Sequence, residues 1–178
     1  MTFPFPMYGP GLVGAGVWST ALALTQTAAE GMATGLTFVM KISSGAFSGV
    51  SGSKVRLSLT APSAGGCTIS DFYFGELATG DNFTGDQVHC FYSGSNSIVI
   101  PSSTTIVLDQ IDYAFSSTKN YAIAYYATGG PSEGYLSNVN TLYRYSSIPV
   151  NSSASTTKTG FLGATAVIAL LTKIEVFN

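Results

Sequence analysis

Short stretches in which apolar and polar residues alternate recur along most of this chain, and loops rich in glycine and serine separate them. The clearest is KVRLSLT at residues 54–60, where Val55, Leu57 and Leu59 share one face. A period of two residues is typical of a half-buried β-strand. Further strands are predicted at residues 36–42, 67–75, 88–92, 97–101, 104–109, 121–127, 142–146 and 165–177. Short strands with turn residues between them, and no long amphipathic helix, predict an all-β fold, an antiparallel jelly-roll-like β-sandwich.

The start of the chain departs from this pattern. No charged residue precedes Glu30, and the stretch FPFPMYGPGLVGAG combines proline, glycine and aromatic residues. Its prolines exclude a regular helix and disfavour a central strand. We therefore expect an extended N-terminal docking arm over residues 1–34 and a β-sandwich over residues 35–178. Within that arm, residues 17–33 favour a strand followed by a loop or a short helix.

The arm is too apolar to be a solvated tail. It packs either on a neighbouring subunit or over its own domain, and the sequence leaves both arrangements open. The side chains expected to make the assembly contacts are Phe3, Phe5, Met7, Tyr8 and Trp18.

The uncharged start does not have the features of a membrane segment. A signal peptide has a basic region before its apolar stretch, and none is present here. A spanning helix needs about 20 mainly apolar residues, whereas this stretch contains Pro4, Pro6 and Pro10 and then several Ser and Thr residues. We expect neither membrane insertion nor export.

Charge is scarce over the whole chain. Charged residues make up 9% of the sequence, against about 25% in typical soluble domains. The seven basic residues are scattered, which argues against nucleic-acid binding because that requires concentrated positive charge. So little charge gives weak protection against self-association. The composition therefore favours a subunit of an oligomer or a large assembly, and the alternative is a stable β protein kept soluble by Ser and Thr.

The two cysteines, Cys67 and Cys90, are too few for a disulfide scaffold. They form either one pair on neighbouring strands or, the interpretation we favour, two small buried apolar side chains.

The residues that could support catalysis are few. His89 is the only histidine, and it lies in the middle of a predicted strand. The stretch GPSEG around Ser132 matches the pattern of a hydrolase nucleophile, but that motif requires a helix after it and a later histidine. No histidine follows Ser132, so we expect a surface turn there and no enzymatic activity.

The densest acidic stretch contains Asp71, Glu76, Asp81 and Asp86, and we expect solvated loop carboxylates. No cofactor is expected. The alternative is a Ca²⁺ site made by Asp81, Asn82 and Asp86, because Ca²⁺ takes carboxylate and amide oxygens.

Seven of the ten tyrosines lie between residues 113 and 145. They serve as core residues, as a protein interface or as a glycan-binding platform, since tyrosine combines a flat apolar ring with a hydroxyl group. The residues of the expected ligand face are Tyr135, Tyr143 and Tyr145, with Tyr135 placed in a glycine-rich loop.

The stretches KVRLSLTAP, TISDFYFGEL, SIVIPSSTTIVLDQIDYAF and KNYAIAYYATG, within residues 54–129, resemble a known module. It is the small jelly-roll β-sandwich of tailed-phage virion proteins, which also accompanies some esterase-like hydrolases as an accessory domain. The resemblance covers under half of the chain and carries over no catalytic residue.

This resemblance implies a non-enzymatic virion structural protein, either a head fibre, spike or decoration subunit or a tail adhesin. It would be made in the host cytoplasm and incorporated in the virion. Its partners would be other virion proteins, further copies of itself in a homo-oligomer (trimers are common in such fibres) and, for an adhesin, a host-surface glycan. The alternative function is a carbohydrate-binding module that recognises a cell-surface glycan.

Overall fold

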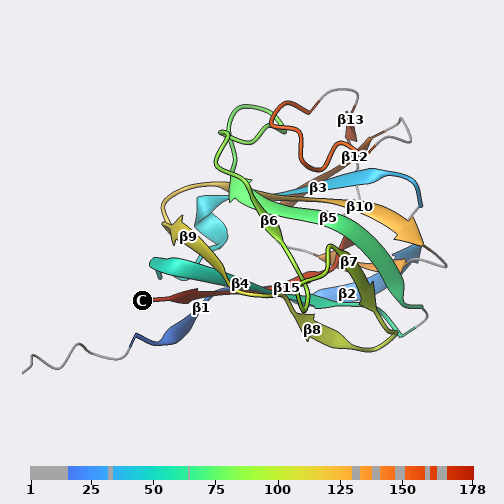
Figure 1. The fold of residues 1–178 in the computed structure, drawn as a ribbon, viewed down its shortest axis with the longest axis horizontal. Coiled ribbons are helices and arrows are strands. Elements are labelled where there is room, and N and C mark those ends of the chain that lie inside the picture. The colour runs from blue at the N-terminus through green and yellow to red at the C-terminus, as the bar shows by residue number, and fades with distance from the viewer. Residues whose placement is uncertain are drawn as a thin grey trace, which may run out of the picture.

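The structure is a computed structural model, and it describes residues 16–31, 34–63, 65–129, 133–137, 141–146, 151–158, 161–163 and 168–178. Two antiparallel β-sheets pack face to face, with a smaller third sheet beside them (Figure 1). The all-β sandwich predicted from the alternating segments is confirmed.

The first sheet has five strands. They are β1 (Trp18–Ala23), β15 (Leu171–Phe177), β4 (Gly52–Thr60), β8 (Thr105–Val107) and β9 (Ile111–Phe115). The central strand β4 pairs with β15 on one side and with β8 and β9 on the other.

The second sheet has seven strands. They are β13 (Phe161–Gly163), β12 (Thr141–Ser146), β3 (Thr37–Ile42), β10 (Tyr121–Gly129), β5 (Cys67–Glu76), β6 (Val88–Cys90) and β7 (Ser97–Ile100). Strands β6 and β7 both pair with β5, one at each end of it.

The remaining elements are short. The third sheet consists of β14 (Ile168–Ala169), β11 (Glu133–Ser137) and β2 (Gln26–Gly31). A single turn of 3-10 helix, η1 (Ser44–Ala46), follows β3. No helix in the described part of the chain is long and apolar enough to cross a membrane.

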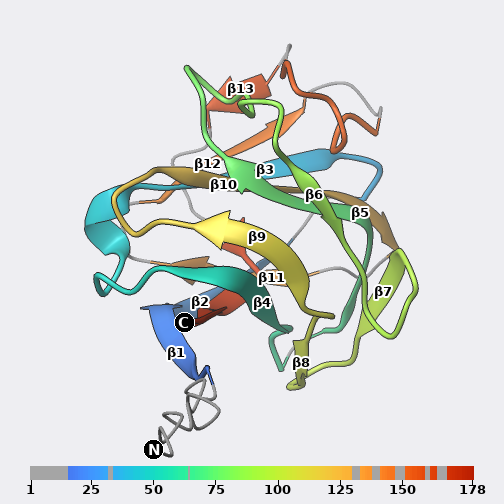
Figure 2. The same cartoon turned by 60° about the vertical axis from the view of Figure 1, so that its left-hand side comes forward.

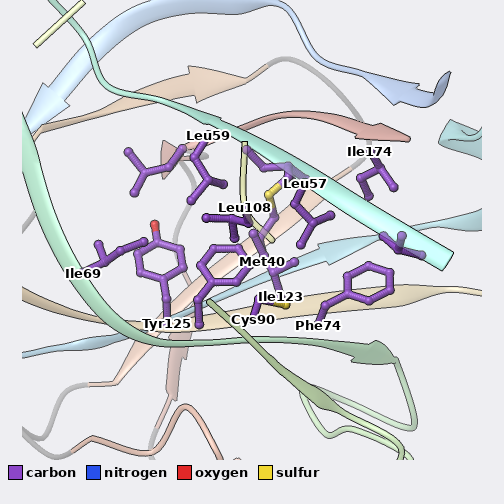
Figure 3. Close-up of a cluster of buried hydrophobic side chains, with 14 of the residues drawn as sticks. Met40, Leu57, Leu59, Ile69, Phe74, Cys90, Leu108, Ile123, Tyr125 and Ile174 are labelled. Carbon is purple, nitrogen blue, oxygen red and sulfur yellow. The ribbon is translucent and has the colours of Figure 1, made fainter. Parts of the chain in front are cut away.

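The core lies between the two large sheets (Figure 3). Leu57, Leu59 and Ile174 enter it from the five-stranded sheet, and Met40 and Ile123 are among those that face them from the seven-stranded sheet. Burying one such side chain contributes about 1.5–3 kcal/mol. The prediction that Val55, Leu57 and Leu59 share the buried face of their strand is confirmed, because all three are at most 1% exposed.

Strand β10 is buried on both faces, and this explains its apolar sequence, YAIAYYA. Its large residues Tyr121, Ile123 and Tyr125 point into the main core. Its small residues Ala122 and Ala124 lie in a second cluster on the outer side of the sheet. The expectation that a share of the tyrosines belongs to the core is confirmed for Tyr121 and Tyr125.

That outer cluster is covered by two segments that lie far apart in the sequence. Phe83, from the loop after β5, packs against Ala122 and Ala124. A second segment, residues 151–158 (hereafter the strap), crosses there, and the Phe83 N–H donates to the carbonyl of Thr156 at 3.0 Å. The buried Lys158 ammonium donates to the Ser152 and Ser153 carbonyls, and burial lowers the pKa of Lys158 to about 8. The strap thereby helps to cover part of the outer face of the seven-stranded sheet.

The predicted boundary between arm and sandwich at residue 34 is wrong. Strand β1 is a member of the five-stranded sheet and pairs with β15 from Trp18↔Phe177 to Ala23↔Lys173. Residues 26–31 form a second strand, β2, where a loop or short helix was expected. The reason is that β15, about 150 residues away in the sequence, offers a sheet edge with which β1 pairs. Of the proposed arm, residues 1–15, 32 and 33 lie outside the described residues.

Candidate functional site

A row of three aromatic rings stands on the outer face of the seven-stranded sheet, where β5 meets β6. Tyr73 and His89 are directly opposite one another across the two strands, and their rings stack with centroids 4.5 Å apart at 14°. Phe91 lies two residues after His89, so its side chain falls on the same face of the chain. Its ring centroid is 4.3 Å from that of His89. Phe91 is 36% exposed, so the row ends in an apolar ring open to solvent.

An irregularity in β5 places a carboxylate beside this row. The pairing between β10 and β5 shifts register between Ala124 and Tyr126, and Asp71 lies at the shift with a φ of +50°. A non-glycine residue in the left-handed region is uncommon, and residues held there tend to cluster at functional sites. The Asp71 N–H donates to the carbonyl of Asn96 at 3.3 Å, which ties the irregularity to the turn before β7. The bulge thus directs the Asp71 carboxylate outward beside Tyr73 and His89.

The Asp71 carboxylate joins three segments of the chain. Its Oδ2 accepts from Asn151 Nδ2 of the strap at 2.6 Å and from Ser70 Oγ at 3.2 Å. Its Oδ1 accepts from Asn96 Nδ2 at 3.4 Å. His89 Nε2 lies 3.8 Å from Oδ1, which is beyond hydrogen-bonding distance. Partial burial, and then the charge of Asp71, raise the pKa of Tyr73, so its phenol stays protonated at neutral pH.

We call Asp71, Tyr73, His89, Phe91 and Asn96 the outer aromatic site. These groups suit the binding of a ligand, because an exposed aromatic ring lies beside an amide and a carboxylate group. The adjacent thiol is no nucleophile, since burial raises the pKa of Cys90 to about 12.

The three tyrosines of the predicted ligand face lie on strands of two different sheets. Tyr135 lies in β11, paired with Ala29 and Ala169 in the three-stranded sheet, and not in a loop as expected. Tyr143 and Tyr145 lie in β12 of the seven-stranded sheet, opposite Met40 and Phe38. The side chains of all three tyrosines lie outside the described residues.

The three residues of the alternative calcium site have separate roles. Asp81 forms an ion pair with Lys41, whose Nζ lies 2.9 Å from its Oδ1. The Asn82 side-chain oxygen accepts from the Lys158 backbone N–H at 2.7 Å. Asp86 accepts from the hydroxyls of Tyr113 and Thr84 and from the backbone N–H of Glu76. All three carbonyl or carboxylate groups are therefore used inside the fold, and no group of three or more His, Cys, Asp or Glu side chains that could hold a metal occurs among the described residues.

The residues predicted for the assembly arm are only partly described. Phe3, Phe5, Met7 and Tyr8 lie outside the described residues. Trp18 lies on β1 and contacts its own sandwich: the Arg56 guanidinium sits 4.4 Å above its ring. Trp18 therefore packs against side chains of its own sheet, and its assembly contact stays a prediction.

Two further expectations concern Cys67, Cys90 and Ser132. Both cysteines are buried and free, which confirms the favoured interpretation that they are small apolar side chains. Ser132 lies outside the described residues, and the segment after it is strand β11 where a nucleophile motif would require a helix.

The sequence reasoning missed the outer aromatic site. It treated Asp71 as a solvated loop residue and His89 as an isolated histidine. The only local signal was the i, i+2 spacing of His89 and Phe91 in VHCFY. The pairing of Tyr73 with His89 depends on the register between two strands, which the sequence does not state.

No protein-family model matches this chain, and no similar protein is found among curated proteins.

Proposed function

We propose that this chain is a non-enzymatic virion structural protein, a head fibre, spike or decoration subunit or a tail adhesin. It docks on a particle and on copies of itself and presents the sandwich outward. Three features support this: the sandwich fold, the uncharged aromatic segment at residues 1–15 and, above all, the way in which the fold uses its few charges.

Every Asp, Glu, Lys and Arg side chain that the structure describes has a partner within the chain. Five basic side chains are in ion pairs with carboxylates: Lys41, Lys54, Arg56, Lys119 and Lys173.

The remaining charged side chains bind neutral groups of the chain. Lys158 is buried against carbonyls. Asp71 and Asp86 accept side-chain hydrogen bonds, and Asp109 accepts from the backbone N–H groups of Ser93 and Gly94. The charged groups that the structure describes are therefore already engaged within the chain.

Such a surface suits permanent association through apolar and neutral polar contacts. Charges that are already paired contribute little to long-range steering or to salt-dependent binding. The place where residues 1–15 join the sandwich also suits docking, because Val17 and Asn178 exchange backbone hydrogen bonds at 2.9 and 3.1 Å. Residues 1–15 are thus joined to the sandwich at a corner of the five-stranded sheet where Val17 is bonded to Asn178.

The test is the solution mass of the full chain, measured by light scattering at low and high salt, with and without residues 1–15. A defined oligomer that is unaffected by salt and becomes a monomer on truncation supports the assembly role. In parallel, immunogold labelling of particles purified from the source tests the virion location. A monomer in every condition, together with unlabelled particles, contradicts the proposal.

A second function is favoured by the outer aromatic site, namely binding of a saccharide, which stacks on rings such as Phe91 and bonds to amide groups such as Asn96. A glycan array with the full chain tests it, using Phe91→Ala against Val107→Ala, a change at an exposed valine in the other sheet. Binding that Phe91→Ala abolishes and Val107→Ala preserves supports this function. A chain that binds no glycan contradicts it.

A further inference from the structure

An apolar groove opens at the end of the seven-stranded sheet where β10, β5 and β7 lie side by side. Gly129, Thr68 and Val99 are directly opposite one another across these three strands, and Gly66 and Pro101 line the groove's end. Its volume is about 290 Å³, and none of its described lining residues is charged. A cavity of about 150 Å³ holds one benzene ring, so this end groove has room for about two aromatic side chains.

The groove borders an open sheet edge. Strand β7 pairs with β5 alone among the described strands. The Asp71 N–H donates to the carbonyl of Asn96, so these two residues form a hydrogen-bonded pair of the antiparallel ladder. Hydrogen-bonded and non-hydrogen-bonded pairs alternate along such a ladder. The backbone groups of Ile98 and Ile100 therefore face β5, and those of Ser97 and Val99 face away from it. In agreement, both backbone groups of Ser97 are bonded to Ser95 Oγ. The Val99 N–H and C=O therefore face outward, and the Val99 side chain is itself 57% exposed.

The chain contains one segment that matches this edge. In FPFPM, residues 3–7, proline occupies every second position. In an extended conformation, Phe3, Phe5 and Met7 direct their N–H groups to one edge of the segment. Pro4 and Pro6 face the opposite edge, which therefore lacks N–H donors. Residues before proline favour extended conformations. Such a segment can add to a sheet edge on one side only, with its two phenylalanines and its methionine on one face.

The positions of the two partners favour a contact between copies. Residues 1–15 join the sandwich at Gly16, beside Asn178, and the end groove lies next to β7. Figures 1 and 2 show the carboxyl terminus and β7 on opposite sides of the molecule. A donor at one end and an acceptor at the other produce a head-to-tail contact, which closes into a ring or continues as a filament.

We propose that residues 3–7 of one copy bind the end groove of a second copy, adding a short strand to the β7 edge. This inference rests on the proposed assembly function and specifies its contact. The binding is apolar and uses backbone hydrogen bonds, in keeping with the uncharged residues 3–7 and the uncharged described lining of the groove.

The test uses the full chain with Val99→Lys, and Val107→Lys as the matched control. Both valines are exposed residues on edge strands, at 57% and 47%, so both variants should fold. A lysine in the groove places an unpaired charge in an apolar contact. We expect Val99→Lys to weaken self-association by about tenfold or more, while Val107→Lys associates like the unchanged chain. Equal association of the two variants overturns the inference.

A photo-crosslinker at position 5, in a mixture of ¹⁴N- and ¹⁵N-labelled full chains, identifies the contact. Mixed-isotope crosslinks to peptides containing Thr68 or Val99 support the inference. Crosslinks within one copy, or between copies at another surface, overturn it. If crosslinking fails in this way but the chain still oligomerises and immunogold still labels the particles, the proposed function stands and only the end-groove contact is wrong.

Discussion

At the residue scale, the polar groups of this protein are mostly used to hold the chain together. The Tyr121 hydroxyl accepts from the Ser116 N–H at 2.8 Å and so secures the turn between β9 and β10. Arg56 binds both carboxylate oxygens of Glu175 on the adjacent strand, at 3.0 and 3.2 Å, and lowers the pKa of Glu175. The two thiols have no charged partner, and both are buried.

Burial raises the pKa of Cys67 and of Cys90 to about 12. An unfolded thiol has a pKa of about 8.5, so the unfolded state loses its proton first as the pH rises. Each thiol's contribution to stability is complete below about pH 8.5 and is lost as the pH approaches 12. Between pH 8 and pH 10, we expect the unchanged chain to lose about 2 kcal/mol more of its free energy of unfolding than Cys90→Ala does, because the variant has no thiol at this position.

Urea unfolding of both proteins at the two pH values measures this difference. Val107→Ala, which removes no titratable group, should keep a constant difference from the unchanged chain. A difference for Cys90→Ala that is the same at pH 8 and pH 10 would contradict the prediction.

At the element scale, the outer cover of the seven-stranded sheet depends on the loop between β5 and β6. Asp86 organises this loop, because its carboxylate accepts from Thr84 and Tyr113 and from the backbone N–H of Glu76. Gln87 then binds the strap through the carbonyl of Ala154 at 3.0 Å. The loop and the strap together hold Asn151 beside Asp71, so the outer aromatic site depends on both.

We expect Asp86→Ala to lower the free energy of unfolding by about 2–3 kcal/mol, because it removes a charged acceptor from several donors. Asp112→Ala is the matched control. It also removes one aspartate, but that side chain is 86% exposed and makes a surface ion pair with Lys54, whose loss costs less than about 1 kcal/mol. Chemical denaturation measures both variants, and equal losses would refute the organising role of Asp86.

At the scale of the whole molecule, the two ends of the described chain lie side by side. The pairing of β1 with β15 begins at Val17 and Asn178 and continues to Ala23. Ala21, Leu22 and Leu24 are buried in the main core. The described sandwich therefore includes the strand that was predicted at the start of residues 17–33 but was assigned to the arm.

We expect removal of residues 1–15 to leave the thermal unfolding transition almost unchanged. Removal of residues 1–24 deletes β1 and three buried side chains, exposes the edge of β15 and should lower the free energy of unfolding by about 5 kcal/mol or more. Circular dichroism during heating distinguishes the two truncations. Two truncated chains of equal stability would show that β1 is dispensable.

Much of the fold follows from local sequence pattern. Alternation identified β4 and its buried face, and the run YAIAYYA identified a strand at residues 121–127. The alternation of buried and exposed side chains along a strand has a period of two residues, which is visible in the local sequence. These features can therefore be predicted without knowing which distant strands pair. The scarcity of charge, and with it the expectation of a neutral surface, is likewise visible in the composition.

The tertiary structure alone decided which strands became neighbours and which side chains met. Nothing local to residues 17–33 reveals that β15 will pair with β1, and nothing near His89 reveals that Tyr73 will stack on it. Asp71 looked like a loop carboxylate until the bulge in β5 and the strap placed it between Asn96 and Asn151. The physical reason is that strand register and sheet order are set by contacts between residues far apart in the chain, whereas periodicity is set by contacts within a strand.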